Sequence, residues 1–518
     1  MSQHEIEVAA LQAVEPGGMK QVEVNGEKVL LLRDGDAVHA VGATCPHAGG
    51  PLAEGVRNGD RIVCPWHKAA FCIRTGAVQD PPALDALPRY DVRVDAGRIL
   101  LTKPASAPPA PPTASDGRCF VIVGAGGAGA VAAQTLRKEG FAGRVVMLDP
   151  ANRVPYDRTV LSKYALSGQK GAEKSPLQSQ SFYREHGIER RTAEVSRIDA
   201  EARRITCADG TVLNYDAALL ATGAAPVLPP LPGAGLRHVY TLRSRADADA
   251  ILAQAERSER AVVLGASFIG MEVAASLRER GLDVTVVGKE AAPFAKQLGE
   301  QVGRAFVGLH ERQGVAFRLG RGVASLEGDG QVSGVVLEGG ERIAADLVVV
   351  GFGVKPATAY AESLKRSDDG GLVVDATLRA APGLYAAGDI ARFPHRGDGE
   401  PIRVEHWRVA EQHGRVAALN MLGRDVRYDA VPFFWTIQYM KRLDYVGHAT
   451  SWDSTVLHGD LGKPEFLAYY VKDGRVAAAA GLGRDHDTAA LIELFARRRD
   501  WQAAELGEHP AAVLAATP

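Results

Sequence analysis

Two short segments near the start of the chain each combine one cysteine with one histidine. Cys45 and His47 belong to the first segment, C-P-H, and Cys64 and His67 belong to the second, C-P-W-H, which follows after sixteen intervening residues. Two thiolates and two imidazoles are the ligands of a [2Fe–2S] centre in which two cysteines bind one iron and two histidines bind the other. The imidazole ligands raise the reduction potential of such a centre above that of an all-cysteine plant-type centre. The pattern therefore predicts a domain that handles single electrons.

A structural zinc site is the alternative, because zinc also accepts two cysteines and two histidines. Zinc fingers, however, keep their two cysteines together and their two histidines together. Here each segment supplies one ligand of each kind, and short Gly/Pro-rich loops follow, such as 48–51 and 75–76. We therefore expect an iron–sulfur cluster with four ligands, which are Cys45, His47, Cys64 and His67.

The surrounding sequence resembles ferredoxin-type Rieske domains through CPHAGGPL at 45–52, CPWHKAAFCIRTG at 64–76 and RYDVRV at 89–94. Rieske domains of the high-potential branch add a disulfide that braces the cluster loops. Gly50 and Trp66 stand at the corresponding positions, so the resemblance implies that this brace is missing. Cys72 is then expected to be a small buried residue and not a ligand.

Length and composition exclude several classes of protein. A chain of 518 residues is too long for one hydrophobic core, so three or four domains are expected. The net charge of −2, without a Lys/Arg block, gives no support for nucleic-acid binding. No apolar run reaches membrane-spanning length, and residues 1–10 lack the regions of a signal peptide. Only five cysteines are present, which is typical of a protein of the reducing cytoplasm.

A proline-rich segment divides the chain. Residues 1–103 carry short alternating strands, such as 21–24 and 28–32, which predict a small all-β domain. Residues 104–116 contain five prolines in thirteen positions, which favours an extended, semi-rigid linker. Such a linker would let the β domain dock on the part that follows or swing away from it.

The part after the linker contains two similar strand–turn–helix units. The apolar run 119–123 leads into the glycine-rich turn 124–129, and the run 261–264 leads into the turn 265–270. An Ala-rich helical pattern follows each turn. Two such Rossmann-type units predict an α/β fold with two dinucleotide sites.

The first unit has the full context of a dinucleotide site. Gly124 and Gly126 allow a tight turn and a close approach of the pyrophosphate, and Gly129 completes the G-x-G-x-x-G motif. The free N–H groups at the start of the next helix favour phosphate binding. Asp149, which ends the next strand, is expected to bind the ribose hydroxyls.

Two later segments resemble motifs of the two-dinucleotide-binding flavoprotein reductases, the pyridine nucleotide-disulfide oxidoreductase superfamily. Ala221, Thr222 and Gly223 form an ATG motif, and Gly388 and Asp389 form a GD motif. The resemblance implies FAD at the first site, with Asp389 near the ribityl–phosphate chain. Residues 120–206 contain no cysteine, so a flavin-linked disulfide is not expected and the cluster is the evident exit for electrons.

The segment VPYDRTVLSK at 154–163 resembles the YDRPxLSK signature of oxygenase-coupled ferredoxin reductases and of apoptosis-inducing-factor-like flavoproteins. That resemblance implies that Arg158 contacts FAD and that Lys163 pairs with a glutamate beside the flavin. The matching glutamate is Glu272, expected on the first turn of the helix after the second glycine motif. A carboxylate that only caps this helix is the alternative.

The second unit departs from a regular NAD site. Gly265 and Gly270 are present, but Ser267 stands at the middle glycine, where its side chain could crowd the pyrophosphate or donate a hydrogen bond to it. The next strand ends at Gly288, where a glutamate is usual, and Lys289 could meet a 2′-phosphate. We therefore expect NAD(P)H, with a slight preference for NADH. A later run, 350–356, resembles the return strand of the family, which places Gly353 near the nicotinamide.

Two segments beyond residue 400 resemble the edge of the flavin site in this family. The resemblance implies that His406 and Trp407 lie at the isoalloxazine edge. Trp435, in the run 433–435, could stack near the flavin, but this run could equally be plain core. The chain as a whole resembles apoptosis-inducing-factor-like proteins that carry an N-terminal Rieske domain.

These expectations combine into one hypothesis of function. NAD(P)H reduces FAD, and the electrons pass singly to the Rieske cluster, whose histidine ligands lie near the surface, and on to an unidentified acceptor. The reductase component of a multi-component oxygenase system, or a redox sensor with little turnover, is the alternative. A monomer or homodimer in the cytoplasm is expected.

The predicted domains are the Rieske domain at 1–103, the linker at 104–116, an FAD-binding domain at 117–240 and 361–429, an NAD(P)H-binding domain at 241–360 and a C-terminal α+β domain at 430–518.

Overall fold

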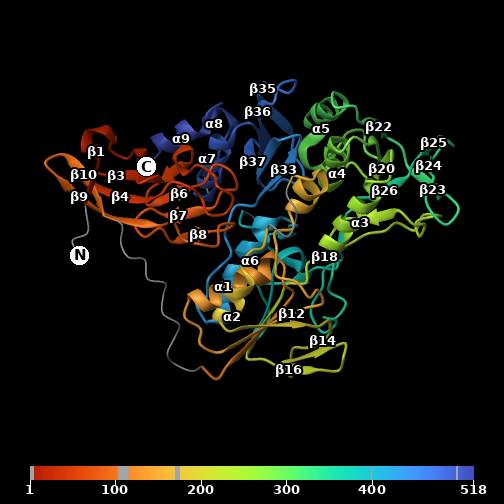
Figure 1. The fold of residues 1–518 in the computed structure, drawn as a ribbon, viewed down its shortest axis with the longest axis horizontal. Helices are drawn as coiled ribbons and strands as arrows, with labels where there is room; N and C mark the ends of the chain where they lie inside the picture. The colour runs from red at the N-terminus through yellow and green to blue at the C-terminus, as the bar shows by residue number, and fades with distance from the viewer. Residues whose placement is uncertain (1–4, 103–115, 170–174, 398, 498–499, 518) are drawn as a thin grey trace.

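The computed structural model describes residues 5–102, 116–169, 175–397, 399–497 and 500–517. Figure 1 shows the N-terminal β domain in red beside the C-terminal domain in blue, with the two dinucleotide-binding parts arranged below and to the right of them. The predicted linker at 104–116 lies almost wholly outside the described residues.

The N-terminal domain is all-β, as the sequence predicts. One sheet has six strands in the order β1-β10-β9-β4-β3-β2, and a smaller sheet has the order β5-β6-β7-β8. The predicted ligands lie on two loops: Cys45 and His47 lie between β4 of the six-stranded sheet and β5 of the smaller sheet, and Cys64 and His67 lie between β6 and β7. The strands are β1 Ile6–Ala10, β2 Met19–Val24, β3 Glu27–Asp34, β4 Ala37–Gly42, β5 Val56–Asn58, β6 Arg61–Val63, β7 Ala70–Cys72, β8 Val78–Asp80, β9 Arg89–Asp95 and β10 Arg98–Thr102, with short helices η1 Leu11–Ala13 and η2 Leu52–Glu54.

The first dinucleotide-binding part contains a sheet of order β13-β12-β11-β17-β30-β29, parallel except for β29. Helices α1 (Gly127–Lys138) and α6 (Trp407–Met421) pack against each other beside this sheet. The other elements of this part are β11 Cys119–Val123, β12 Arg144–Asp149, η3 Leu161–Ala165, α2 Gln180–Glu185, β13 Ile188–Thr192, β14 Val195–Asp199, β15 Arg204–Cys207, β16 Val212–Asn214, β17 Ala217–Leu220, β28 Leu372–Val373, β29 Arg379–Ala381, β30 Leu384–Ala386, η5 Gly388–Ile390, β31 Ala391–Pro394 and β32 Pro401–Arg403.

The second dinucleotide-binding part has a parallel sheet of order β19-β26-β20-β21-β22. A pair of short strands, β18 (Ala224–Pro226) and β27 (Val354–Pro356), connects the two parts. Strand β19 lies across the predicted domain boundary at residue 240. The elements are β19 Val239–Thr241, α3 Arg245–Ala255, β20 Arg260–Leu264, α4 Phe268–Glu279, β21 Asp283–Gly288, α5 Ala295–Glu311, β22 Ala316–Leu319, β23 Val323–Glu327, β24 Gly334–Leu337, β25 Arg342–Ala344 and β26 Leu347–Val350.

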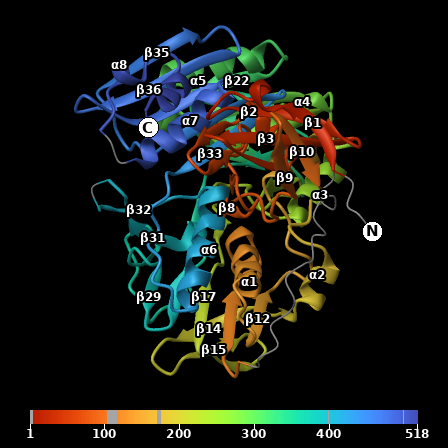
Figure 2. The same cartoon turned by 90° about the vertical axis from the view of Figure 1, so that its left-hand side faces the viewer.

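The C-terminal domain is a five-stranded antiparallel sheet, of order β33-β34-β37-β36-β35, with helices on one face. Its core is shared with the N-terminal domain: Val63 and Ala70 pack in one hydrophobic cluster with Phe433 and Trp435. Figure 2 shows these two domains together above α1 and α6. The elements are β33 Phe433–Gln438, β34 Lys441–Gly447, β35 Ser454–Asp460, β36 Glu465–Lys472, β37 Arg475–Leu482, α7 Asp485–Ala496, α8 Ala503–Leu506 and α9 Pro510–Ala516.

Among the described residues, every helix is too short or too polar to cross a lipid bilayer.

Candidate redox site between the N-terminal domain and the flavin pocket

The four predicted cluster ligands come together where the loop after β4 meets the loop after β6. Cys45 and Cys64 are buried, and each thiol lies within hydrogen-bonding distance of the other. On the outer side, Nδ1 of His47 lies 3.1 Å from Nδ1 of His67. Two nitrogens bound to one tetrahedral metal at ordinary bond lengths are about 3.4 Å apart. Sulfur ligands at one end and nitrogen ligands at the other fit a [2Fe–2S] cluster.

The surroundings of His67 and Cys64 also suit metal binding. Burial lowers the pKa of His67 well below its ordinary value, which favours the neutral imidazole that binds a metal. Gly50 lies so close to Cys64 that a Cβ at this position would come within 2.7 Å of the Sγ atom. All five cysteines are described and none forms a disulfide. The expectation for Cys72 needs correction: it ends the short strand β7 and is half-buried, because the polar turn that follows leaves it at the domain surface.

The first glycine motif has the geometry of a phosphate-binding turn. Gly124 has a φ of 104°, and a Cβ there would lie 2.3 Å from the main-chain oxygen of Ala221. A Cβ on Gly129 would lie 2.0 Å from the oxygen of Gly124. Gly126 instead faces open space at the start of α1, where a phosphate group would lie. The carboxylate of Asp149 accepts hydrogen bonds from the main-chain N–H groups of Ala125 (2.8 Å) and Ala151 (2.8 Å).

A cavity of about 450 Å³ opens in front of this turn. Arg158 and Arg243 both line it, and burial together with the Arg243 cation lowers the pKa of Arg158. Arg243 donates to the carboxylate of Asp389 at 2.7 Å, while its buried Nε has no partner within the described part of the chain. Two cations and an unused donor fit the pyrophosphate and ribityl groups of FAD. Arg243 carries no sequence motif, and the sequence gives no signal for it. The other predicted residues that line this cavity are Gly126, Lys163, Ala221, Thr222, Gly223, Ser267, Glu272, Gly353, Gly388, Asp389, His406, Trp407 and Trp435.

Lys163 and Glu272 form the predicted pair. The Lys163 Nζ atom lies 3.1 Å from the Glu272 carboxylate, and their side chains are only 6% and 2% exposed. The carboxylate also accepts hydrogen bonds from Ser162 (2.5 Å) and Thr436 (2.7 Å). Glu272 is the fifth residue of α4, just beyond the first turn, and the cap of this helix is Ser267. Thr436 was not indicated by the sequence, because it comes from the C-terminal domain.

The second glycine motif leads to a separate cavity of about 420 Å³, lined by Gly265, Ser267, Lys289 and Gly353. Gly265 and Gly270 again approach other backbone too closely for a Cβ. The Ser267 hydroxyl accepts from the N–H of Gly270 (3.2 Å) and donates to the oxygen of Gly351 (3.1 Å). Because this hydroxyl is used to cap α4, its role is local and it does not crowd the turn. Lys289 is exposed at the rim of the cavity.

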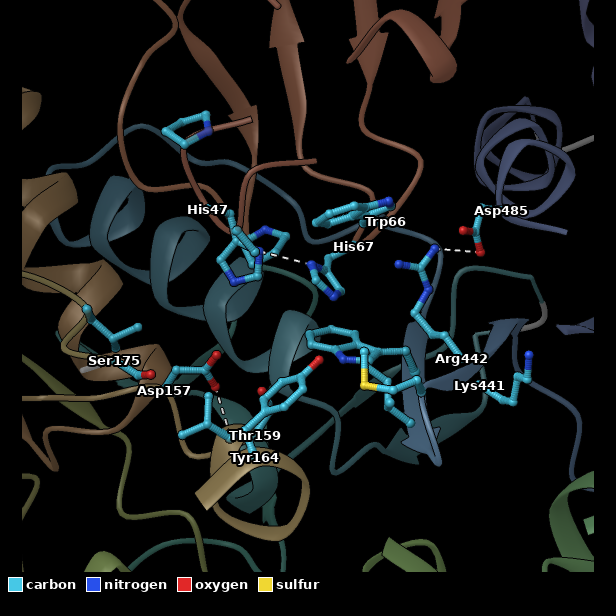
Figure 3. Close-up of a pocket in the computed structure, with 18 of the residues that line it drawn as sticks. His47, Trp66, His67, Asp157, Thr159, Tyr164, Ser175, Lys441, Arg442 and Asp485 are labelled. Carbon is cyan, nitrogen blue, oxygen red and sulfur yellow. Dashed lines mark hydrogen bonds and ion pairs between the residues drawn. The ribbon is translucent and has the colours of Figure 1, made fainter. Parts of the chain in front are cut away.

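Trp435 joins the flavin cavity to the cluster loops. Its ring centroid lies 4.4 Å from that of His67, and it lines the flavin cavity as well. Phe433 is fully buried core, while Phe434 lines the flavin cavity beside His406, so the run 433–435 serves both purposes. His47 and His67 are half-buried and line a cavity of about 840 Å³ between the domains (Figure 3).

Figure 3 shows how the side chains around this cavity lie. His47 and His67 face each other from the cluster loops, with Trp66 beside them. Tyr164 points toward the histidines from the reductase side, and Arg442 pairs with Asp485 at 2.5 Å. Thr159 and Trp435 line both this cavity and the flavin cavity, so the two cavities share part of one wall.

Comparison with known proteins agrees with this geometry. The family model "Pyridine nucleotide-disulphide oxidoreductase" matches residues 119–414, "Rieske [2Fe-2S] domain" matches residues 4–91 and "Reductase C-terminal" matches residues 433–516. The chain therefore belongs to the pyridine nucleotide-disulphide oxidoreductase family and carries a Rieske domain. It is an FAD-dependent NAD(P)H oxidoreductase with a [2Fe–2S] cluster.

Individual relatives cover most of the chain. Apoptosis-inducing factor 3 of Mus musculus is 36% identical over 514 residues, which are 96% of this chain and 84% of that protein. Rhodocoxin reductase of Rhodococcus erythropolis is 35% identical over 380 residues, which are 73% of this chain and 89% of that protein. Among solved structures, a covalent putidaredoxin reductase–putidaredoxin complex superposes with a TM-score of 0.74 and 29% identity, covering 78% of this chain and 99% of that one.

Proposed function

We propose that this protein oxidises NAD(P)H and that the electrons pass through FAD to its own Rieske cluster, and from there to an acceptor outside the chain. Bound FAD supplies the conversion from a two-electron donor to a one-electron acceptor. The described residues provide each part of this route in one continuous region of the molecule.

The donor end lies where the two dinucleotide cavities meet. Gly353 lines both cavities, so a nicotinamide held at the second motif would have access to the flavin cavity beside this glycine. Lys163 and Glu272 stand beside it as a buried ion pair. Ser162 and Thr436 donate hydrogen bonds to the Glu272 carboxylate and hold it in place. The charges of the pair are therefore already oriented toward the flavin cavity, and the side chains need not move when a charge develops there.

The contact between His67 and Trp435 is the observation that carries this proposal. One ring belongs to the cluster loops and the other to the wall of the flavin cavity, and their centroids are 4.4 Å apart. Electron transfer between two centres becomes faster as the distance falls, and van der Waals contact between rings provides the shortest route. Residues 120–206 contain no cysteine pair that could take the electrons instead.

The fused Rieske domain takes the place of a separate redox partner. In the superposed complex, putidaredoxin reductase is joined to putidaredoxin, which is a different protein. Here a [2Fe–2S] domain of the same chain lies against the flavin-binding part. We infer that the cluster is the first acceptor and that a further acceptor, either a protein of ferredoxin type or a downstream enzyme, takes the electrons from it.

A reductase component of an oxygenase system is the second candidate. The relative named "Anthranilate 1,2-dioxygenase system ferredoxin--NAD(+) reductase component" of Burkholderia cepacia is 36% identical over 385 residues, covering 73% of this chain. In that case the external acceptor would be an oxygenase.

The absence of disulfides among five cysteines favours a reducing compartment such as the cytoplasm.

An anaerobic titration tests the proposed route. Purified protein with both cofactors is titrated with NADH and, separately, with NADPH, while flavin and cluster absorbance are followed together. We expect both centres to bleach, with the cluster following the flavin. A flavin that bleaches while the cluster stays oxidised would contradict the proposal at its central step.

A further inference from the structure

We propose that Lys68 and Asp444 are positioning residues that hold His67 against Trp435, so that the Rieske domain stays docked during electron transfer. This inference rests on the proposed function, and it concerns the step from the flavin cavity to the cluster. Lys68 lies in the segment 64–76 but is not one of the predicted ligands, Asp444 lies in none of the motifs, and both lie outside the lining of the flavin cavity.

His67 and Lys68 are neighbours in the chain, and the residues that they contact, Trp435 and Asp444, are neighbours in the C-terminal sheet. Lys68 directly follows His67 on the cluster loop. Asp444 on β34 is the direct cross-strand partner of Trp435 on β33. The His67–Trp435 contact and the Lys68–Asp444 contact therefore lie side by side across the domain boundary. If the cluster loop shifted by one residue along the sheet, both contacts would be broken together.

The ion pair itself is fully buried. The Lys68 Nζ atom lies 2.7 Å from Oδ2 of Asp444, and the two side chains are 0% and 1% exposed. Lys68 also donates to the main-chain oxygen of Asp485 at 3.2 Å and to that of Pro65. A Rieske domain docked in any other register would leave the Lys68 charge buried without its counter-ion, which is strongly unfavourable, so the pair favours this one docked position.

Further groups complete the environment of Asp444. Its carboxylate accepts a hydrogen bond from the Thr488 hydroxyl at 2.8 Å and lies 3.2 Å from Arg442 Nε. Arg442 in turn pairs with Asp485. The two cations of this charged group, Lys68 and Arg442, balance its two carboxylates, those of Asp444 and Asp485. The C-terminal domain alone has one cation too few, and Lys68 of the N-terminal domain supplies it.

A second contact holds the main chain of the same loop. Arg408 on α6 is only 1% exposed and donates to the carbonyl oxygens of Lys68 (3.0 Å) and Pro81 (3.0 Å). Arg408 follows Trp407, which lines the flavin cavity. The cluster loop is thus fixed from the C-terminal sheet and from the flavin-binding part together, which opposes a swinging motion.

The test compares Asp444→Asn with the double variant Lys68→Met/Asp444→Leu. The first leaves the Lys68 charge buried without its counter-ion, whereas the second removes both charges. Asp500→Asn is the matched control, since Asp500 pairs with Arg475 on the exposed surface of the same domain. FAD content and the cluster's electron paramagnetic resonance spectrum establish that each variant is loaded and folded.

Stopped-flow mixing with NADH then separates flavin bleaching from cluster bleaching. We expect flavin bleaching to stay unchanged in all variants. Cluster bleaching should be independent of solvent viscosity in the parent and in Asp500→Asn. In Asp444→Asn it should be slower by about tenfold or more, a change of about 1.4 kcal/mol in the barrier, and should become viscosity-dependent. The double variant should recover most of the parental rate, because apolar side chains of similar volume fill the same buried contact and no charge is left without a partner.

Several results would overturn the inference. A parental rate that falls with viscosity would show that the domain swings. If the cluster in Asp444→Asn bleaches at the parental rate, the pair does not position His67. The same conclusion follows if the cluster bleaches more slowly but a measured shift in its midpoint potential fully explains the slowing. Equal, viscosity-independent slowing in both variants would indicate altered packing only. If the parental cluster does not bleach at all, the proposed function fails instead, so the two failures are distinguishable.

Discussion

His67 and Trp435 lie with their ring centroids 4.4 Å apart, although one belongs to the N-terminal domain and the other to the C-terminal sheet. Trp435 also lines the flavin cavity, and His67 is a predicted ligand of the cluster. In the proposed function, this contact joins the Rieske domain to the flavin cavity. Substitutions along the route from the nicotinamide to the cluster should therefore affect separate, measurable steps.

Replacing Trp435 should slow the step from the flavin to the cluster. Trp435→Ala removes the ring that fills the space between His67 and the flavin cavity, so we expect cluster bleaching about tenfold slower, or about 1.4 kcal/mol in the barrier. Stopped-flow absorbance at flavin and cluster wavelengths measures both steps. Trp452→Phe, in the same domain but away from the flavin cavity, is the control. Unchanged cluster bleaching in Trp435→Ala would remove Trp435 from the route.

Removing a cluster ligand should separate the two halves of the reaction. Cys64→Ser is expected to abolish cluster reduction while flavin reduction by NAD(P)H stays within about twofold of the parental rate. The reason is that Cys64 lies in the N-terminal domain, whereas the nicotinamide and flavin cavities lie in other domains. Loss of flavin reduction in a variant that still holds FAD would disprove this modular arrangement.

The Lys163–Glu272 pair should matter for flavin reduction. Lys163→Ala leaves the buried Glu272 carboxylate without its cation, which costs about 3–5 kcal/mol for a buried pair. We expect weaker FAD retention and slower flavin bleaching by NADH. Lys163→Ala/Glu272→Gln should be less severe than Lys163→Ala, because no charge is left unpaired. Flavin content after gel filtration and single-turnover kinetics measure both effects, and equal damage in the two variants would contradict the electrostatic explanation.

Lys289 should set the discrimination between the two nicotinamide cofactors. It is exposed at the rim of the second cavity, and the strand before it ends in Gly288 without an acidic residue. Lys289→Ala should lower kcat/KM for NADPH by about tenfold, or about 1.4 kcal/mol, and leave that for NADH nearly unchanged. Lys296→Ala, which removes a neighbouring lysine that is paired with Glu290, is the comparison. An equal loss for both cofactors would show that Lys289 does not read the 2′-phosphate.

Acid should destabilise the protein partly through His310. Burial lowers the pKa of His310 from its ordinary 6.5 to about 4, and its Nε2 lies 2.7 Å from Gln438 Oε1. The unfolded chain therefore takes up a proton on this histidine more readily than the folded chain. The contribution of His310 to the free energy of unfolding is fully present above pH 6.5 and is lost as the pH falls toward 4. Its size is about 3 kcal/mol. The drop in Tm between pH 7 and pH 5 should be smaller in His310→Gln, and an unchanged drop would contradict this assignment.

Local motifs allowed much of the site to be predicted. The Cys/His segments and the glycine turns are short, and their chemistry depends on neighbours within a few residues, so spacing alone indicated a cluster and two dinucleotide sites. The family resemblance added the Lys163–Glu272 pair, whose atoms the structure brings to 3.1 Å. The role of Ser267 was left open by the sequence, because only the neighbouring Gly351 oxygen decides where its hydroxyl points.

Other residues had no local pattern that could reveal them. Arg243 enters the flavin cavity through its contact with Asp389, and Thr436 reaches Glu272 from another domain. The histidine ligands, which were expected near the surface, are half-buried, and the Trp435 ring of the C-terminal sheet lies against His67. Each of these facts depends on which distant surfaces meet when the domains pack.

The sequence by itself thus determined that the chain carries a [2Fe–2S] cluster site and two dinucleotide sites, since ligand chemistry and turn geometry are properties of short segments. Only the tertiary structure decided that the Rieske domain lies against the flavin cavity with His67 on Trp435 and Lys68 on Asp444. The physical reason is that burial of apolar surface and pairing of buried charges act between residues hundreds of positions apart, and no single segment of the chain carries that information.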